Sequence, residues 1–135
     1  MSQENVEIVQ AWLLAFEKDR DAFSAITHPA IEWMPFEENH TPTRGVEGAL
    51  RIRDAWLDAW DEHTTEIEEI LDGDDGVYLA AKLIGRGRGS GATVEVRIYG
   101  HIKVRDGKVV YVYEHLNRED ALKAVGLEDR HRLGP

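Results

Sequence analysis

Residues 94–105 alternate between apolar or small side chains and polar ones more regularly than any other part of the chain. Val94, Val96, Ile98, Gly100, Ile102 and Val104 form one row, and Glu95, Arg97, Tyr99, His101, Lys103 and Arg105 form the other. A period of two is that of a β-strand with one buried face. Asp106-Gly107 is typical of a two-residue hairpin turn, and residues 108–116 then form the return strand. The chain must therefore build an antiparallel sheet.

The remaining patterns predict helices first and strands afterwards. We expect a helix at 2–18, a short helix from 19 to 26, a strand at 31–34, a loop at 35–44 and a helix beyond Gly45 with Ala49, Ile52, Trp56, Ala59 and Trp60 on its apolar face. Further strands follow at 64–71 and 77–84, and Asn117 caps a final helix that ends at Gly126. This order indicates one α+β domain over residues 1–135, with helices on one face of a curved sheet.

The charge is partitioned along the chain. The 26 acidic and 16 basic residues give a net charge of −10. Residues 57–81 hold 9 acids and no Lys or Arg, whereas residues 82–108 hold 7 bases and 2 acids. We expect an acidic strand to lie beside a basic one, so that opposite charges pair across the sheet.

Composition also limits the partners. The net negative charge disfavours nucleic acid and membrane surfaces. The absence of Cys excludes disulfides and thiolate metal sites, and the six His residues show no metal-ligand spacing. We therefore expect no cofactor and no metal. The chain has neither an apolar run of about 18 residues nor a leader pattern, which favours a cytoplasmic location.

Glycine occupies every second position from Gly85 to Gly91. A strand without one row of side chains can bend sharply or let another element approach closely. Three tryptophans, Trp12, Trp56 and Trp60, are expected in the core on helical faces. Trp33 adjoins the loop at 35–44 and is the tryptophan we place at a cavity.

Three segments carry a resemblance to a known family: residues 28–33 (HPAIEW), 107–110 (GKVV) and 118–127 (REDALKAVGL). With the order of elements, they resemble the SnoaL-like branch of the NTF2-like superfamily. The resemblance implies a cone, in which a strongly curved, mostly antiparallel sheet wraps around three N-terminal helices and a short C-terminal helix follows. It also implies an apolar cavity, and often a homodimer formed through the outer sheet face.

The relatives of this family include ketosteroid isomerases, epoxide hydrolases and polyketide cyclases. The proton-transferring positions of the isomerases match Trp12, Met34 and Gly100 here, and none of these can exchange the required proton. The epoxide hydrolases need an Arg-x-Asp pair on an inner strand, but residues 77–84 carry only Lys82 as a charged group. The cyclases need an acid on the last strand, where Glu114 stands.

Glu114 is therefore the candidate catalytic residue. The resemblance implies a pocket face of Val110, Val112, Glu114 and Leu116, where an apolar environment favours a protonated carboxyl suited to acid–base chemistry. Alternation alone would bury the opposite face, which carries Val109, Tyr111, Tyr113 and His115. Which face lines the pocket stays open at this stage.

The candidate ligand-binding residues are Trp12, Phe16, Trp33, Met34, Ile98, Gly100 and Val112. Three functions follow as hypotheses. The first is acid–base catalysis by Glu114 on an apolar cyclic substrate, of cyclase, isomerase or hydrolase type. The second is binding of a small apolar organic ligand without chemistry. The third is a homodimeric interaction module, whose outer sheet face would present Arg97, Tyr99, His101, Tyr111 and Tyr113.

Overall fold

The computed structural model describes residues 2–35 and 42–127. Its elements are α1 (Ser2–Lys18), α2 (Arg20–Ala25), β1 (Thr27–Met34), β2 (Thr43–Arg44), α3 (Gly45–Asp58), β3 (Trp60–Gly73), β4 (Gly76–Gly87), β5 (Thr93–Arg105), β6 (Lys108–His115) and α4 (Arg118–Ala124). The predicted α+β class is confirmed, with three helices among the first elements and a short helix after the last strand. Most of the loop predicted at 35–44 lies outside the described residues.

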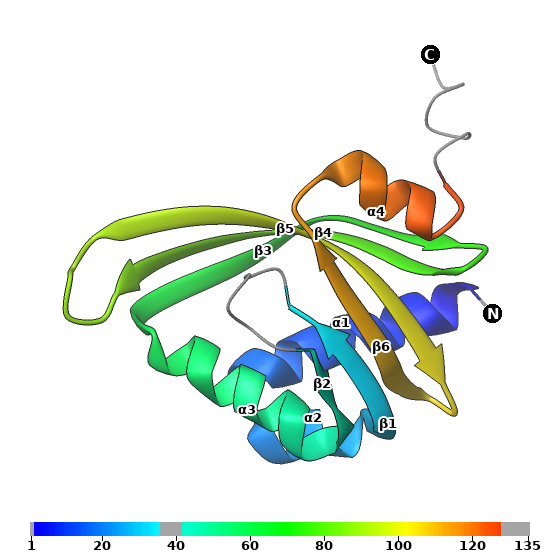
Figure 1. Ribbon diagram of the computed structural model, residues 1–135, viewed down its shortest axis with the longest axis horizontal. Helices are drawn as coiled ribbons and strands as arrows, with labels where there is room; N and C mark the ends of the chain where they lie inside the picture. Colours follow the sequence, from blue (N-terminus) through cyan, green and yellow to red (C-terminus); the bar gives the residue numbers. More distant parts are fainter. Residues whose placement is uncertain (1, 36–41, 128–135) are drawn as a thin grey trace.

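The six strands form one sheet in the order β2-β1-β6-β5-β4-β3. Neighbouring strands are antiparallel except β1 and β6, which run parallel. Figure 1 shows that the sheet bends strongly, with α1, α2 and α3 on one side and α4 on the other. The sheet therefore has an inner face toward the first three helices and an outer face that α4 partly covers.

Strand β4 is buried on both faces. Val77 and Leu79 join the core beneath α1, whereas Tyr78 and Ala80 join a second core beneath α4. The alternation of side chains along a strand produces this division. All four side chains are at most 6% exposed. Residues 77–80 of β4 therefore separate the two cores and contribute to both.

Local signals fix several boundaries as predicted. The Asp19 carboxylate accepts a hydrogen bond from the Ala22 amide at 3.1 Å and starts α2. The Asn117 side chain caps α4 by accepting from the Glu119 and Asp120 amides. Asp106 and Gly107 have φ angles of 55° and 73°, the left-handed pair of a tight hairpin turn between β5 and β6.

Two side chains fasten α4 to the outer sheet face. The Arg118 guanidinium donates two hydrogen bonds to the Glu69 carboxylate, at 2.8 and 2.7 Å. The Tyr78 hydroxyl donates a third to the same carboxylate at 2.8 Å. Burial and this carboxylate raise the pKa of Tyr78. The network therefore keeps the phenol neutral and joins β3, β4 and α4.

Opposite charges pair across the sheet as the sequence predicts. On β3, Glu62 pairs with Arg86 at 3.0 Å and Glu66 with Lys82 at 3.6 Å. Glu68 reaches across β4 to Arg97 of β5 at 3.0 Å. Exposed pairs of this kind contribute about 0.2–1 kcal/mol each. Part of the negative charge of residues 57–81 is thus neutralised by basic side chains on β4 and β5.

Trp60 differs from its predicted place on a helix. The helix α3 ends at Asp58, and Trp60 begins β3, four residues after Trp56. The two rings pack at 5.3 Å, so their spacing of four residues resembles a continued helix although the chain has changed conformation. Trp60 is only partly buried and belongs to neither hydrophobic core, so the predicted core position and the predicted element were both wrong.

More of the glycine-rich segment forms part of the sheet than the sequence predicts. Strand β4 continues through Gly85 to Gly87, and β3 begins four residues earlier than the predicted strand at 64–71. A Cβ atom at Gly85 would lie 2.6 Å from the Trp60 ring. The expectation that these glycines admit a close neighbour is therefore confirmed at Gly85, where an indole lies on the backbone.

None of the helices in the described ranges combines the length and the apolar character required to cross a bilayer.

We predict that Gly85→Ala lowers the free energy of unfolding by about 1–3 kcal/mol, because the added methyl group overpacks against Trp60. Denaturant unfolding followed by tryptophan fluorescence measures the effect. The matched control is Gly100→Ala on β5, where the new Cβ would meet no atom closer than 3.5 Å. Equal stability of the two variants would contradict the close approach.

Candidate functional site

An apolar cavity of about 110 Å³ lies between the inner sheet face and helices α1 and α3. Its lining comprises Trp12, Leu13, Phe16, Glu17, Trp33, Pro35, Ile52, Trp56, Thr65, Leu79, Ala81, Leu83, Ile98, Gly100, Ile102, Val112 and Glu114. An apolar cavity of roughly 150 Å³ accommodates benzene. The space therefore suits a ligand of about one small ring.

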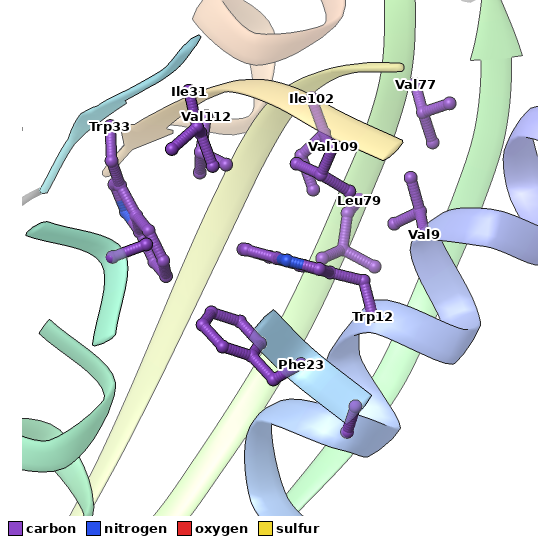
Figure 2. Close-up of a cluster of buried hydrophobic side chains, with 12 residues drawn as sticks. Val9, Trp12, Phe23, Ile31, Trp33, Val77, Leu79, Ile102, Val109 and Val112 are labelled. Carbon is purple, nitrogen blue, oxygen red and sulfur yellow. The ribbon is translucent and has the colours of Figure 1, made fainter. Parts of the chain in front are cut away.

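Aromatic rings from α1 and β1 form one wall, and Phe23 of α2 packs against them from outside the cavity lining. Figure 2 shows Trp12 of α1, Trp33 of β1 and Phe23 of α2 turned toward one another on the inner side of the sheet. The Trp12 ring lies 5.1 Å from both Trp33 and Phe23, and Phe16 lies 6.2 Å from Trp33. Tilted contacts at these distances suit the ring quadrupoles. The wall is thus a packed aromatic cluster.

Hydrogen bonds orient the Trp12 indole. Its Nε1 donates to the Thr27 hydroxyl at 3.0 Å, and this hydroxyl donates to the Phe23 carbonyl oxygen at 2.6 Å. Thr27 is 2% exposed, so water does not replace these contacts. The chain of two hydrogen bonds joins α1 to the start of β1.

Glu114 lies on the cavity wall as predicted. Its Oε2 accepts a hydrogen bond from Trp33 Nε1 at 2.8 Å. Glu114 pairs in register with Gly100 on β5, a position with no side chain. The carboxylate is therefore oriented by an indole and faces space that a larger residue at position 100 would occupy.

A bulge in β6 decides which side chains face the cavity. Val104 pairs with Val109 and Lys103 with Tyr111, so Val110 is the extra residue. Val109 and Val112 consequently both join the inner core. The predicted pocket face was right for Val112 and Glu114 and wrong for Val110 and Leu116, which do not line the cavity. Leu116 follows β6 and is 66% exposed.

The other predicted ligand-binding residues can now be placed. The cavity brings together Trp12, Phe16, Trp33, Ile98, Gly100 and Val112. Met34 is the exception and does not line the cavity. It follows Trp33 in an extended strand, so its side chain projects from the opposite face. Pro35, one residue further, lines the cavity instead.

Sequence reasoning missed a second carboxylate, Glu17, in the cavity lining. Its Oε1 atom is buried and has no hydrogen-bond partner within the described ranges. Glu17 follows Leu13 by four residues on α1, so helical spacing places it on the cavity face. This spacing is the signal that could have identified it. The contributions of β3, β4 and α3 were also missed: Thr65, Leu79, Ala81, Leu83, Ile52 and Trp56.

The predicted outer-face row does not form one open surface. Tyr99 packs into the core beneath α4. His101 is 7% exposed, and its Nε2 lies 2.8 Å from the Asp75 carbonyl oxygen. Burial lowers the pKa of His101. Arg97 pairs with Glu68. Tyr113, which is 40% exposed, remains accessible.

Within residues 2–35 and 42–127, no group of three His, Asp or Glu side chains is arranged to hold a metal ion.

The bent sheet and its helical cover define a cone-shaped α+β fold with an apolar cavity on its inner side. A family model described as the SnoaL-like domain matches residues 9–112. The chain therefore belongs to the SnoaL-like family.

Solved structures with low sequence identity share this fold. A protein described as a SnoaL-like polyketide cyclase from Jannaschia sp. CCS1 is 18% identical, with 92% of each chain covered and a TM-score of 0.75. An LEH-like epoxide hydrolase of M. tuberculosis is 16% identical, with 92% of this chain and 90% of that one covered and a TM-score of 0.70. A protein with a ketosteroid isomerase-like fold from Catenulispora acidiphila, in complex with trimethylamine, is 16% identical, with 90% of this chain and 93% of that one covered and a TM-score of 0.71. These similarities show an NTF2-like fold. The search of curated proteins finds no match.

We predict that Thr27→Val destabilises the fold by about 1–3 kcal/mol, because the buried Trp12 indole N–H loses its acceptor. Thermal and denaturant unfolding measure the loss. Thr64→Val, at an exposed position on β3, serves as the control and should leave stability within about 0.5 kcal/mol. A Thr27→Val protein as stable as the unmodified chain would refute the orienting role of this hydroxyl.

Proposed function

We propose that this chain binds a small apolar cyclic molecule in the cavity and that Glu114 transfers a proton on it. The observation that carries the proposal is the Glu114 carboxylate on an apolar wall, oriented by the Trp33 indole at 2.8 Å. The glycine at position 100 leaves room for a ligand beside it. Structural neighbours named as a polyketide cyclase and an epoxide hydrolase support chemistry on small molecules.

The expected chemistry is general acid–base catalysis. An apolar cavity limits access of bulk water to the ligand, so proton transfer between the Glu114 carboxylate and the ligand takes place in a site of low dielectric constant. A positioned acid or base of this kind contributes roughly 10²–10⁴-fold to a reaction rate. The hydrogen bond from Trp33 fixes the direction in which the carboxylate presents its oxygens.

Binding without chemistry is the alternative. The described lining contains no Asp, His, Lys, Arg or Tyr. Trp12 and Gly100, at two positions matched to the isomerases, cannot transfer a proton, and Met34 lies away from the cavity. These observations favour a protein that holds a hydrophobic ligand by shape if Glu114 proves inert.

We predict that the protein catalyses exchange of the α-protons of cyclohexanone in D2O, which NMR detects without knowledge of the natural substrate. Glu114→Gln should lower the exchange rate at least 10²-fold, because the amide cannot accept the proton. The control is Glu119→Gln, at an exposed position on α4, which should exchange at the unmodified rate. Bound cyclohexanone that exchanges only at the buffer rate would reject catalysis in favour of binding alone.

We also propose a homodimer through the part of the outer sheet face that α4 leaves open. Tyr113 is 40% exposed there and Tyr111 is partly exposed, and Leu116, just after the end of β6, is 66% exposed. Aromatic and aliphatic side chains of this kind are typical of interface cores.

Sedimentation at micromolar concentration should therefore give a dimer, and Tyr113→Glu should convert it to a monomer because the charge would be desolvated at the interface. Lys123→Glu, at an exposed position on α4, is the control and should remain dimeric. A monomeric unmodified chain would reject the dimer.

A further inference from the structure

We infer that the cavity selects an apolar ligand that carries a protonated amine, and that Glu17 is the residue that binds the amine. The inference rests on the proposed role of the cavity as a ligand site, but not on catalysis by Glu114. It adds the chemical class of the ligand and a second polar residue, from α1 rather than from the sheet.

Glu17 contributes a carboxylate to the cavity lining. Its buried Oε1 has no hydrogen-bond partner within the described residues. A buried polar atom without a partner costs free energy, which a ligand donor would recover. Glu17 is also the penultimate residue of α1, at the helix end whose exposed carbonyls favour positive charge. An ammonium bound there would meet the carboxylate and the negative end of the helix together.

The charge of the described lining also favours a cationic ligand. Its two charged side chains, Glu17 and Glu114, are both acidic, and it contains no Lys, Arg or His. An anionic ligand would meet two carboxylates and no cation. A neutral hydrocarbon would leave the Glu17 oxygen buried without a donor. A protonated amine donates charge-assisted hydrogen bonds, which are about twice as strong as neutral ones.

The aromatic composition of the wall supports a cation for an independent reason. Trp12, Phe16, Trp33 and Trp56 contribute rings to the lining. The faces of such rings attract an ammonium group within about 6 Å of the ring centre, and tryptophan does so best. Phe16 and Glu17 both line this small cavity, so a cation bound by the carboxylate lies near an aromatic ring. The small cavity volume limits the apolar part to about one ring.

Benzylammonium and ethylbenzene form a matched pair of probes, since they have the same shape and differ by one charge. At pH 7, isothermal titration calorimetry should show that benzylammonium binds at least tenfold more tightly. Glu17→Gln should reduce benzylammonium affinity at least tenfold and change ethylbenzene affinity less than twofold. Glu7→Gln, at an exposed position of the same helix, is the control and should bind both probes as the unmodified chain does.

A second variant keeps the test independent of how Glu17→Gln folds. Phe16→Leu retains an apolar side chain but removes the ring, and it should weaken benzylammonium more than ethylbenzene. Equal or tighter binding of ethylbenzene by the unmodified chain overturns the amine inference and leaves the ligand site intact. Binding of neither probe overturns both the inference and the cavity as a ligand site. An unchanged preference in Glu17→Gln removes Glu17 from the role.

Discussion

The packing of Trp12 on Trp33 is the contact on which the rest of the structure depends. It joins α1 to β1 at the inner sheet face, and truncation of a buried tryptophan costs about 3–5 kcal/mol. The place of Trp12 fixes the next turn of α1, which carries Phe16 and Glu17. The place of Trp33 fixes the indole that holds Glu114. One aromatic contact therefore positions both carboxylates. Glu17 lies on the helical turn after Trp12, and Glu114 accepts a hydrogen bond from Trp33.

Most of the fold is predictable because its signals are local. Alternation over residues 94–105 and the Asp106-Gly107 turn define β5 and β6 without reference to the rest of the chain. The end of α3 is not predictable in this way, because Trp60 continues the helical spacing of Trp56 from a different element. The extension of β4 through Gly85 also depends on a partner, the Trp60 ring, which no local pattern reveals.

The site is less predictable than the fold for the same reason. The position of Glu114 came from a resemblance, since alternation along the last strand would have exposed it. The bulge at Val110 reconciles the two, and a bulge is defined by the register of two neighbouring strands. Glu17 was overlooked because an acid near a helix end is usually solvated. Its burial depends on how α1 meets a sheet assembled from distant segments.

The parallel pairing of β1 with β6 sets the order in which the chain can assemble. The strands β3 to β6 follow one another as hairpins, so they can form from neighbouring segments as synthesis proceeds. Trp33 and Glu114 are 81 residues apart, and loop closure of this length is slow. The N-terminal helices and β1 must therefore wait for the last strand before the cavity closes. Until then the apolar stripe of α1 lacks the complete sheet that covers it in the folded protein, and apolar surface exposed in this way favours aggregation.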